Sequence, residues 1–234
     1  IDRDDPRNRR RRPSIIVETE NTRILVDTSP DMRNQLLDAE VWQVDAILFT
    51  HAHADHVNGI DDIRSLNHYH GGAIDAFGSI ETLDVLQERF AYIFEPYREV
   101  NPQFWRPCLT PHVIDGTFTI GDIEIRPFHQ EHGRMPSLGF RFGKFGYSTD
   151  VKTLPEEAFD LLAGIEVWIV DALGETPHPT HSHVDQTLEW IARIAPERAV
   201  LTHLSNRTDY ARLAARLPAG VEPGIDGMVI HIPE

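Results

Sequence analysis

Hydrophobic and polar positions divide the chain into short strands and amphipathic helices. Continuous apolar runs at 46–49 and 199–201 predict buried strands, and so does the segment 167–171, in which four apolar residues precede Asp171. Short β-rich segments separated by polar turns predict three hairpins, over 14–27, 118–128 and 139–149. Helical spacing of apolar residues predicts helices at 30–37, 57–66, 79–94, 155–162, after 185 and at 210–217. Strands in two groups with helices between them indicate a layered α/β protein.

One loop concentrates metal-competent side chains. Four of them lie within six residues, in the order His51, His53, Asp55 and His56. The predicted strand 46–49 leads into this loop, and apolar residues spaced for one helical face follow it over 57–66. Layered α/β proteins place their chemistry on loops at the carboxyl ends of strands. The loop is therefore the first candidate for a functional site.

The residue types in this loop favour a metal site over a surface loop that is merely rich in histidine. Imidazole nitrogens and carboxylate oxygens are the usual ligands of zinc, manganese and iron. In a turning loop, His51 and His53 can hold one ion, while Asp55 and His56 turn toward a second. A mixed nitrogen and oxygen set is what a two-metal hydrolytic site needs. Histidine tracts without such a role lack a buried strand before them and an amphipathic helix after them.

The motif His51-x-His53-x-Asp55-His56 resembles the signature of the metallo-β-lactamase superfamily of hydrolases. Within that superfamily the chain is most similar to the phosphodiesterase branch, in particular to phosphoribosyl cyclic phosphodiesterases. The resemblance implies an αββα sandwich, with two sheets face to face and helices outside, formed as a single domain by residues 1–234. It also implies a closing strand at 224–230, in which Asp226 would be structural.

The start of the chain departs from the pattern of the family. The family usually opens with a hydrophobic strand and a glycine-rich turn. Neither is visible, so we expect the first strand of the fold to be absent. Residues 1–13 are polar and without periodicity, which predicts a flexible arm. The arginine run 9–12 within it is either a solvated segment or part of an arm that faces a phosphate.

Three further residues complete the metal site that the resemblance implies. His132 precedes a short loop and a Gly-Phe strand, as in the family, which leaves His129 as a neighbour at the strand end. Asp150 follows the predicted hairpin 139–149 and would bridge both ions, with a helix N-cap as its alternative role. The implied sets are His51, His53 and His132 on metal one, Asp55, His56 and His203 on metal two, and Asp150 between them. We expect two divalent ions, zinc or manganese, with iron as a further choice.

The same resemblance assigns the catalytic roles. His183, two residues before Asp185, matches the active-site histidine of the phosphodiesterase branch and would give a proton to the leaving oxygen. His181 is the alternative, and either histidine could instead belong to a loop that caps the following helix. Asp55 would also orient the attacking water. Asp27, at the end of a predicted strand, is either a partner that orients a ligand histidine or a turn residue.

Charge and composition limit the classes of molecule with which the protein is expected to interact. With 37 acidic and 22 basic residues the formal net charge is −15, which disfavours nucleic acid and leaves a small phosphate ester as the expected substrate. No apolar run is long enough to span a membrane. The only cysteine, Cys108, permits no intrachain disulfide, which fits a cytoplasmic location. Residues 95–111, rich in proline and aromatic residues, predict a lid, a packed loop or the surface of a homodimer.

These patterns predict a binuclear metal-dependent hydrolase, a phosphodiesterase acting on a small cyclic phosphate such as a phosphoribosyl cyclic phosphate or nucleotide. A lactonase or thioesterase-type hydrolase using the same ions is the first alternative. A tRNA-processing endonuclease is the second, but the acidic charge and the lack of a long basic insertion argue against it. A non-catalytic carrier is the third, but the intact set of seven ligands argues against that role.

Overall fold

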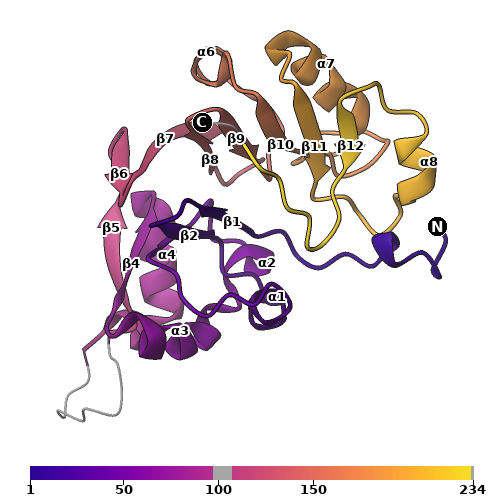
Figure 1. The fold of residues 1–234 in the computed structure, drawn as a ribbon. Coiled ribbons are helices and arrows are strands. Elements are labelled where there is room, and N and C mark those ends of the chain that lie inside the picture. Colours follow the sequence, from indigo (N-terminus) through magenta and orange to yellow (C-terminus); the bar gives the residue numbers. More distant parts are fainter. Residues whose placement is uncertain (97–106, 233–234) are drawn as a thin grey trace. The chain divides into compact units, whose positions relative to one another are not determined.

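The computed structural model describes residues 1–96 and 107–232, which divide into two compact units (Figure 1). One unit consists of residues 12–124, and the other of residues 1–11 and 125–234. Each unit has its own hydrophobic core. Most of the segment 95–111, predicted as a lid or dimer surface, lies outside the described residues.

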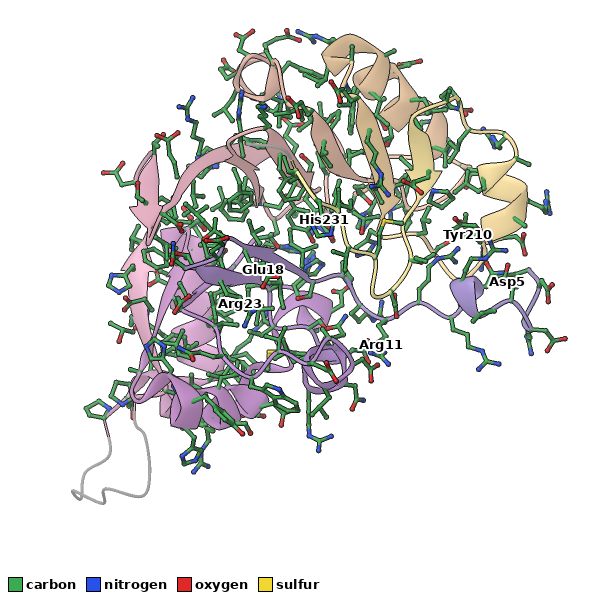
Figure 2. The ribbon with its side chains drawn as sticks, in the orientation of Figure 1. Asp5, Arg11, Glu18, Arg23, Tyr210 and His231 are labelled. Carbon is green, nitrogen blue, oxygen red and sulfur yellow. The ribbon has the colours of Figure 1, made fainter. Side chains whose placement is uncertain are left out.

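In unit 12–124, five strands form one sheet in the order β1-β2-β3-β4-β5. They are β1 (Ile15–Glu18), β2 (Arg23–Val26), β3 (Ala46–Leu48), β4 (Ile74–Gly78) and β5 (Leu109–Val113). β1 and β2 are the predicted hairpin, and Glu18 and Arg23 form an ion pair of 2.7 Å across it (Figure 2). β2 to β5 run parallel, so their carboxyl ends lie at one edge of the sheet.

The helices of this unit are shorter than the periodicity predicts. They are α1 (Met32–Asp38), α2 (Ala54–Val57), the 3-10 turn η2 (Ile60–Asp62), α3 (Ile63–His70), α4 (Ile80–Arg89) and α5 (Ala91–Phe94). The helix predicted over 79–94 starts as expected, because the Ser79 hydroxyl accepts from the N–H of Thr82, but it breaks at Phe90. The helix predicted over 57–66 is interrupted at Gly59.

Gly59 interrupts the helix because the chain approaches another loop at this point. Its N–H donates to the carbonyl of Thr28 at 2.8 Å, and a Cβ at this position would lie 2.0 Å from the carbonyl oxygen of Ser29. Val57 and Ile60, on either side, are fully buried, as their helical spacing predicts. The close approach therefore ties the loop after β2 to the segment that follows the histidine motif.

We expect Gly59→Ala to lower the free energy of unfolding by about 1–3 kcal/mol, because the added methyl group overlaps a backbone carbonyl. Urea unfolding of the purified variants measures this difference. Gly72→Ala is the matched control, since nothing lies within 4 Å of a Cβ there. Equal stability of the two variants would contradict the packing at Gly59.

The second sheet has seven strands in the order β12-β11-β10-β9-β8-β7-β6. They are β6 (Phe118–Ile120), β7 (Ile123–Gln130), β8 (Ser137–Phe142), β9 (Phe145–Ser148), β10 (Val167–Asp171), β11 (Arg198–Thr202) and β12 (Val221–Pro223). The division between the units falls inside β7, after Glu124. β7, β8 and β9 pair antiparallel, whereas β9 to β12 run parallel.

The core of unit 125–234 forms around Trp168 on β10, whose side chain is fully buried. Its indole N–H donates to the Ser148 hydroxyl at 3.1 Å, so the buried ring keeps a hydrogen-bond partner. Helices α6 (Glu156–Leu162), α7 (Val184–Ile194) and α8 (Tyr210–Ala214) contribute apolar residues to this core. Two sheets with helices packed against them confirm the predicted α/β fold class.

Residues 1–11 make defined contacts within their unit, although the sequence predicts a flexible arm. They contain one 3-10 turn, η1 (Pro6–Asn8). The N–H of Tyr210 donates to Asn8 Oδ1 at 2.7 Å, and the guanidinium of Arg7 lies 4.2 Å from the centre of the Tyr210 ring. The N–H of Asp2 donates to the Asp209 carboxylate at 2.8 Å. These contacts attach the arm to the start of α8.

The last strand lies earlier than predicted. β12 pairs with β11, and residues 224–230 form no strand. The Asp226 carboxylate accepts from the N–H of Arg11 at 3.0 Å (Arg11 is labelled in Figure 2), and Gly227, with a φ of 77°, turns the chain. Asp226 is thus structural, as expected, but it sits in a turn. Among residues 1–96 and 107–232, no helix is both long and apolar enough to cross a membrane.

Candidate metal centre

The histidine motif of unit 12–124 lies between the end of β3 and the first turn of α2. His51 and His56 are fully buried, whereas His53 and Asp55 are half-buried. The Nε2 atom of His51 lies 2.9 Å from the Nδ1 atom of His53, so two imidazole nitrogens face each other. Arg89, in α4, donates to the carbonyl of Ala52 at 2.8 Å and holds the loop between these two histidines.

Asp27 orients this loop from the end of the neighbouring strand. Its Oδ2 accepts from the Nδ1 of His56 at 2.7 Å, and its Oδ1 accepts from the N–H of Thr50 at 2.8 Å. Complete burial raises the pKa of Asp27, while the contacts with His56 and Thr50 lower it. A carboxylate that accepts a hydrogen bond from Nδ1–H leaves the Nε2 lone pair of His56 available to a metal ion. Of the two roles considered for Asp27, the structure thus supports the histidine partner.

In unit 125–234, three histidines surround the buried carboxylate of Asp150. The Nε2 atoms of His132, His203 and His181 lie 3.4, 3.3 and 3.8 Å from its oxygens. Asp150 follows β9 and His203 follows β11, and both strands run parallel to β10 between them, so the carboxyl ends of strands at one edge of the sheet deliver both side chains. The helix-cap role considered for Asp150 is wrong, because α6 begins only at Glu156.

His181, and not His183, joins the cluster around Asp150. The Nδ1 of His181 donates to Asp171 Oδ2 at 3.0 Å, and its ring centre lies 4.7 Å from that of His203. His183 occupies the N-cap position of α7 without a side-chain cap bond, and its buried Nδ1 has no hydrogen-bond partner among the described residues. Of the two histidines considered as proton donor, His181 is therefore the one that lies beside Asp150.

Sequence reasoning did not single out Asp171. This fully buried residue ends β10, and its Oδ2 accepts from the N–H of Val151 as well as from His181. Its backbone carbonyl accepts from the hydroxyls of Ser182 and Thr187, which fixes the loop that carries His181. The available signal was an aspartate at the end of a buried strand with a histidine-rich loop after it.

Hydrogen bonds to the backbone fix the remaining side chains of this cluster. Ser137 Oγ donates to the carbonyl of Asp150 at 2.7 Å, and Gln130 donates to Ser137 Oγ at 3.1 Å. The Nδ1 of His132 donates to the carbonyl of Thr180 at 2.7 Å, which directs Nε2 toward Asp150. His129 is exposed on β7, so His132 is the member of this pair that turns inward.

Three residues at these strand ends have backbone angles that favour glycine. Asp27, Asp150 and His203 have φ values of 63°, 50° and 57°. Such angles cost a non-glycine residue of order 1 kcal/mol or more, and they persist where the surrounding structure holds them in place. Strain of this kind at positions with titratable side chains is typical of functional sites, which agrees with the predicted role of these strand ends.

The donor atoms suit a divalent metal ion. In unit 125–234, one ligand atom from each of Asp150, His181 and His203 lies within 4.8 Å of the others, and His132 Nε2 lies 3.4 Å from Asp150 Oδ2. These four side chains offer one donor more than the predicted set of His132, Asp150 and His203 needs. Imidazole and carboxylate donors in this mixture fit zinc, manganese or iron. The predicted ligands are His51, His53, Asp55 and His56 in unit 12–124, and His132, Asp150 and His203 in unit 125–234. That all seven serve one site stays a prediction from the family resemblance.

A family model described as a beta-lactamase superfamily domain matches residues 22–204. The chain therefore belongs to the metallo-β-lactamase superfamily, as the motif at 51–56 predicts, and its two sheets with helices are consistent with the αββα fold of that superfamily. Among solved structures, the chain is similar to a crystal structure of a new diphosphatase from the PhnP family. That structure is 31% identical with a TM-score of 0.89, and the match covers 98% of this chain and 88% of that one.

Curated relatives match as well. An octanoyltransferase of Porphyromonas gingivalis is 32% identical over 236 residues, which cover 99% of this chain and 47% of that protein. A ribonuclease Z of a Bradyrhizobium species is 33% identical over 142 residues, which cover 58% of this chain and 46% of that protein. The chain thus spans about half the length of the curated relatives it matches.

Proposed function

We propose that the protein is a metal-dependent phosphodiesterase that hydrolyses a small cyclic phosphate, such as a phosphoribosyl cyclic phosphate or a cyclic nucleotide. The observation that carries this proposal is the likeness to a PhnP-family diphosphatase over 98% of the chain. A diphosphatase cleaves a bond at phosphorus, so the likeness favours phosphorus chemistry over the lactonase and thioesterase alternatives. The similarity to ribonuclease Z is compatible with the same bond type.

The proposed centre holds two divalent ions, zinc or manganese, with iron as a further choice. Its ligands are His51, His53, Asp55, His56, His132, Asp150 and His203. Bound there, the ions would polarise the phosphoryl oxygen, lower the pKa of water and neutralise the charge that develops on phosphorus. The carboxylate of Asp27 and the backbone carbonyl of Thr180 support this assignment, because each accepts a hydrogen bond from the Nδ1 of one proposed ligand histidine.

His181 is the proposed proton donor to the leaving oxygen, in place of His183. Its Nδ1–H donates to Asp171, and in the imidazolium form its Nε2, which faces Asp150, carries the proton that would pass to the leaving oxygen. Asp171 acts here as a positioning residue, because a buried carboxylate on the far nitrogen fixes the ring and its tautomer. Asp55 keeps the proposed role of orienting the attacking water.

A panel of substrates tests this function on the purified, metal-loaded protein. We expect turnover of a cyclic ribose phosphate and of bis(p-nitrophenyl) phosphate, and none of a lactone or a thioester. An organic diphosphate belongs in the panel because of the diphosphatase similarity, and a precursor tRNA because of the ribonuclease similarity. Activity on lactones without activity on any phosphodiester would refute the proposal. The absence of a nucleic-acid substrate, the homodimer and the cytoplasmic location stay predictions.

A further inference from the structure

The guanidinium of Arg12 lies beside the carboxylate of Asp55. Its closest nitrogen is 3.8 Å from Asp55 Oδ2, which is an ion-pair contact too long for a hydrogen bond. The Arg12 side chain is 59% exposed, and its guanidinium makes no hydrogen bond within residues 1–96 and 107–232. An exposed ion pair of this length contributes little, so the guanidinium can take another anionic partner at small cost.

The backbone of Arg12, in contrast, is held firmly. Its N–H donates to Asp31 Oδ2 at 2.8 Å, and its carbonyl accepts from Gln35 Nε2 at 2.7 Å. The Ser29 hydroxyl in turn donates to Gln35 Oε1 at 2.7 Å. Ser29 and Asp31 belong to the loop that begins with Asp27, the partner of His56. The loop that orients a proposed ligand histidine therefore also fixes the place from which the Arg12 side chain extends.

The charge of the protein makes such a cation useful. A chain with a formal net charge of −15 repels an anionic substrate, and a local positive charge offsets that repulsion at the point of binding. A guanidinium is suited to this task because it can donate two parallel hydrogen bonds to phosphate oxygens. Arg89 is less suited, because its guanidinium is engaged with the carbonyl of Ala52.

We propose that Arg12 binds the phosphate group of the substrate, as a specificity-determining residue that leaves Asp55 for the anion when the substrate enters. This inference rests on the proposed phosphodiesterase function. It gives the last arginine of the run 9–12 a role. Arg9, in contrast, is exposed and forms no ion pair with a carboxylate among the described residues. The remaining arginines of the run, Arg10 and Arg11, make their contacts with Thr208 and Asp226 instead.

Binding of inorganic phosphate to the metal-loaded protein tests this directly. We expect Arg12→Ala to raise the Kd of phosphate, measured by titration calorimetry, about tenfold, which corresponds to loss of one charge-assisted contact. The phosphate Kd of Arg12→Lys should lie between that of the wild type and that of Arg12→Ala, because lysine keeps the charge and loses the paired donors. The metal content of each variant is measured in the same samples. Arg9→Ala, which removes an equal charge from the same segment, should leave the Kd unchanged.

Three results would overturn the proposal. They are an unchanged phosphate Kd in Arg12→Ala, an equal loss in Arg9→Ala, and a loss in Arg12→Ala that metal content accounts for. The third result would mean that Arg12 acts only by pairing with Asp55 and so supports metal binding. Kinetics separate this failure from failure of the proposed function. If wild-type protein turns over a phosphodiester and Arg12→Ala raises neither KM nor the phosphate Kd, only the role of Arg12 is refuted. If wild-type protein turns over no phosphodiester, the proposed function is refuted first.

Discussion

Asp150→Asn should reduce kcat/KM for a phosphodiester by about a thousandfold or more, which corresponds to about 4 kcal/mol of transition-state stabilisation. Nitrogens of three histidines lie within 3.8 Å of this one carboxylate, so Asp150 supplies the negative charge that all three histidines contact. A neutral amide removes the charge that would balance two neighbouring dications. Asparagine is close in size and tolerates the φ of 50° at this position, so the strand end keeps its conformation.

The measurement is steady-state kinetics together with metal content, for Asp150→Asn and for a control. Asp185→Asn is the control, because Asp185 is exposed in α7 and pairs with Arg216 at the surface. We expect the control to retain both metal and activity. An Asp150→Asn variant with undiminished activity and metal content would exclude this carboxylate from the centre.

His181→Ala should reduce kcat by about a hundredfold to a thousandfold for a substrate with a basic leaving group, such as a ribose hydroxyl. The loss should be much smaller for a p-nitrophenolate leaving group, which departs without a proton. This difference in leaving-group dependence identifies a proton donor, since a residue that only supports the fold would slow both substrates alike.

His183→Ala is the matched control for this assignment, because His183 is only two residues away and makes no side-chain cap bond on α7. We expect its kinetics to stay close to those of the wild type. If His183→Ala shows the selective loss with the basic leaving group and His181→Ala does not, His183 is the proton donor, as the family resemblance implies, and the contact of His181 with Asp171 serves another purpose. Both variants should retain metal.

Much of the fold could be predicted because the chain repeats one local pattern. Buried apolar strands that end in aspartate or histidine are readable from a single sequence, and this pattern located Asp27, His51, Asp150 and His203. The β1–β2 and β8–β9 hairpins followed from alternation and from the turns between the strands. The strands of each hairpin pair as predicted, because the short turn between them sets their register.

The errors arose where contacts between distant segments decide the structure. Gly59 interrupts a well-spaced helix because the Ser29 carbonyl occupies the place of its Cβ, and no local pattern records that approach. The place of His181 beside Asp150 depends on Asp171, which lies on another element and accepts from the Nδ1 of His181. Residues 224–230 turn instead of forming a strand, and Asp226 of this turn binds the backbone of Arg11, more than two hundred residues earlier.

The central claim is that the protein uses two divalent ions to hydrolyse a phosphodiester. The most direct measurement is a metal titration, in which protein stripped by a chelator receives zinc or manganese in steps while turnover of a cyclic ribose phosphate is followed. We predict no turnover without metal and a rise that levels off at two ions per chain. Full turnover in the stripped protein, or no phosphodiester turnover at saturating metal, would contradict the claim.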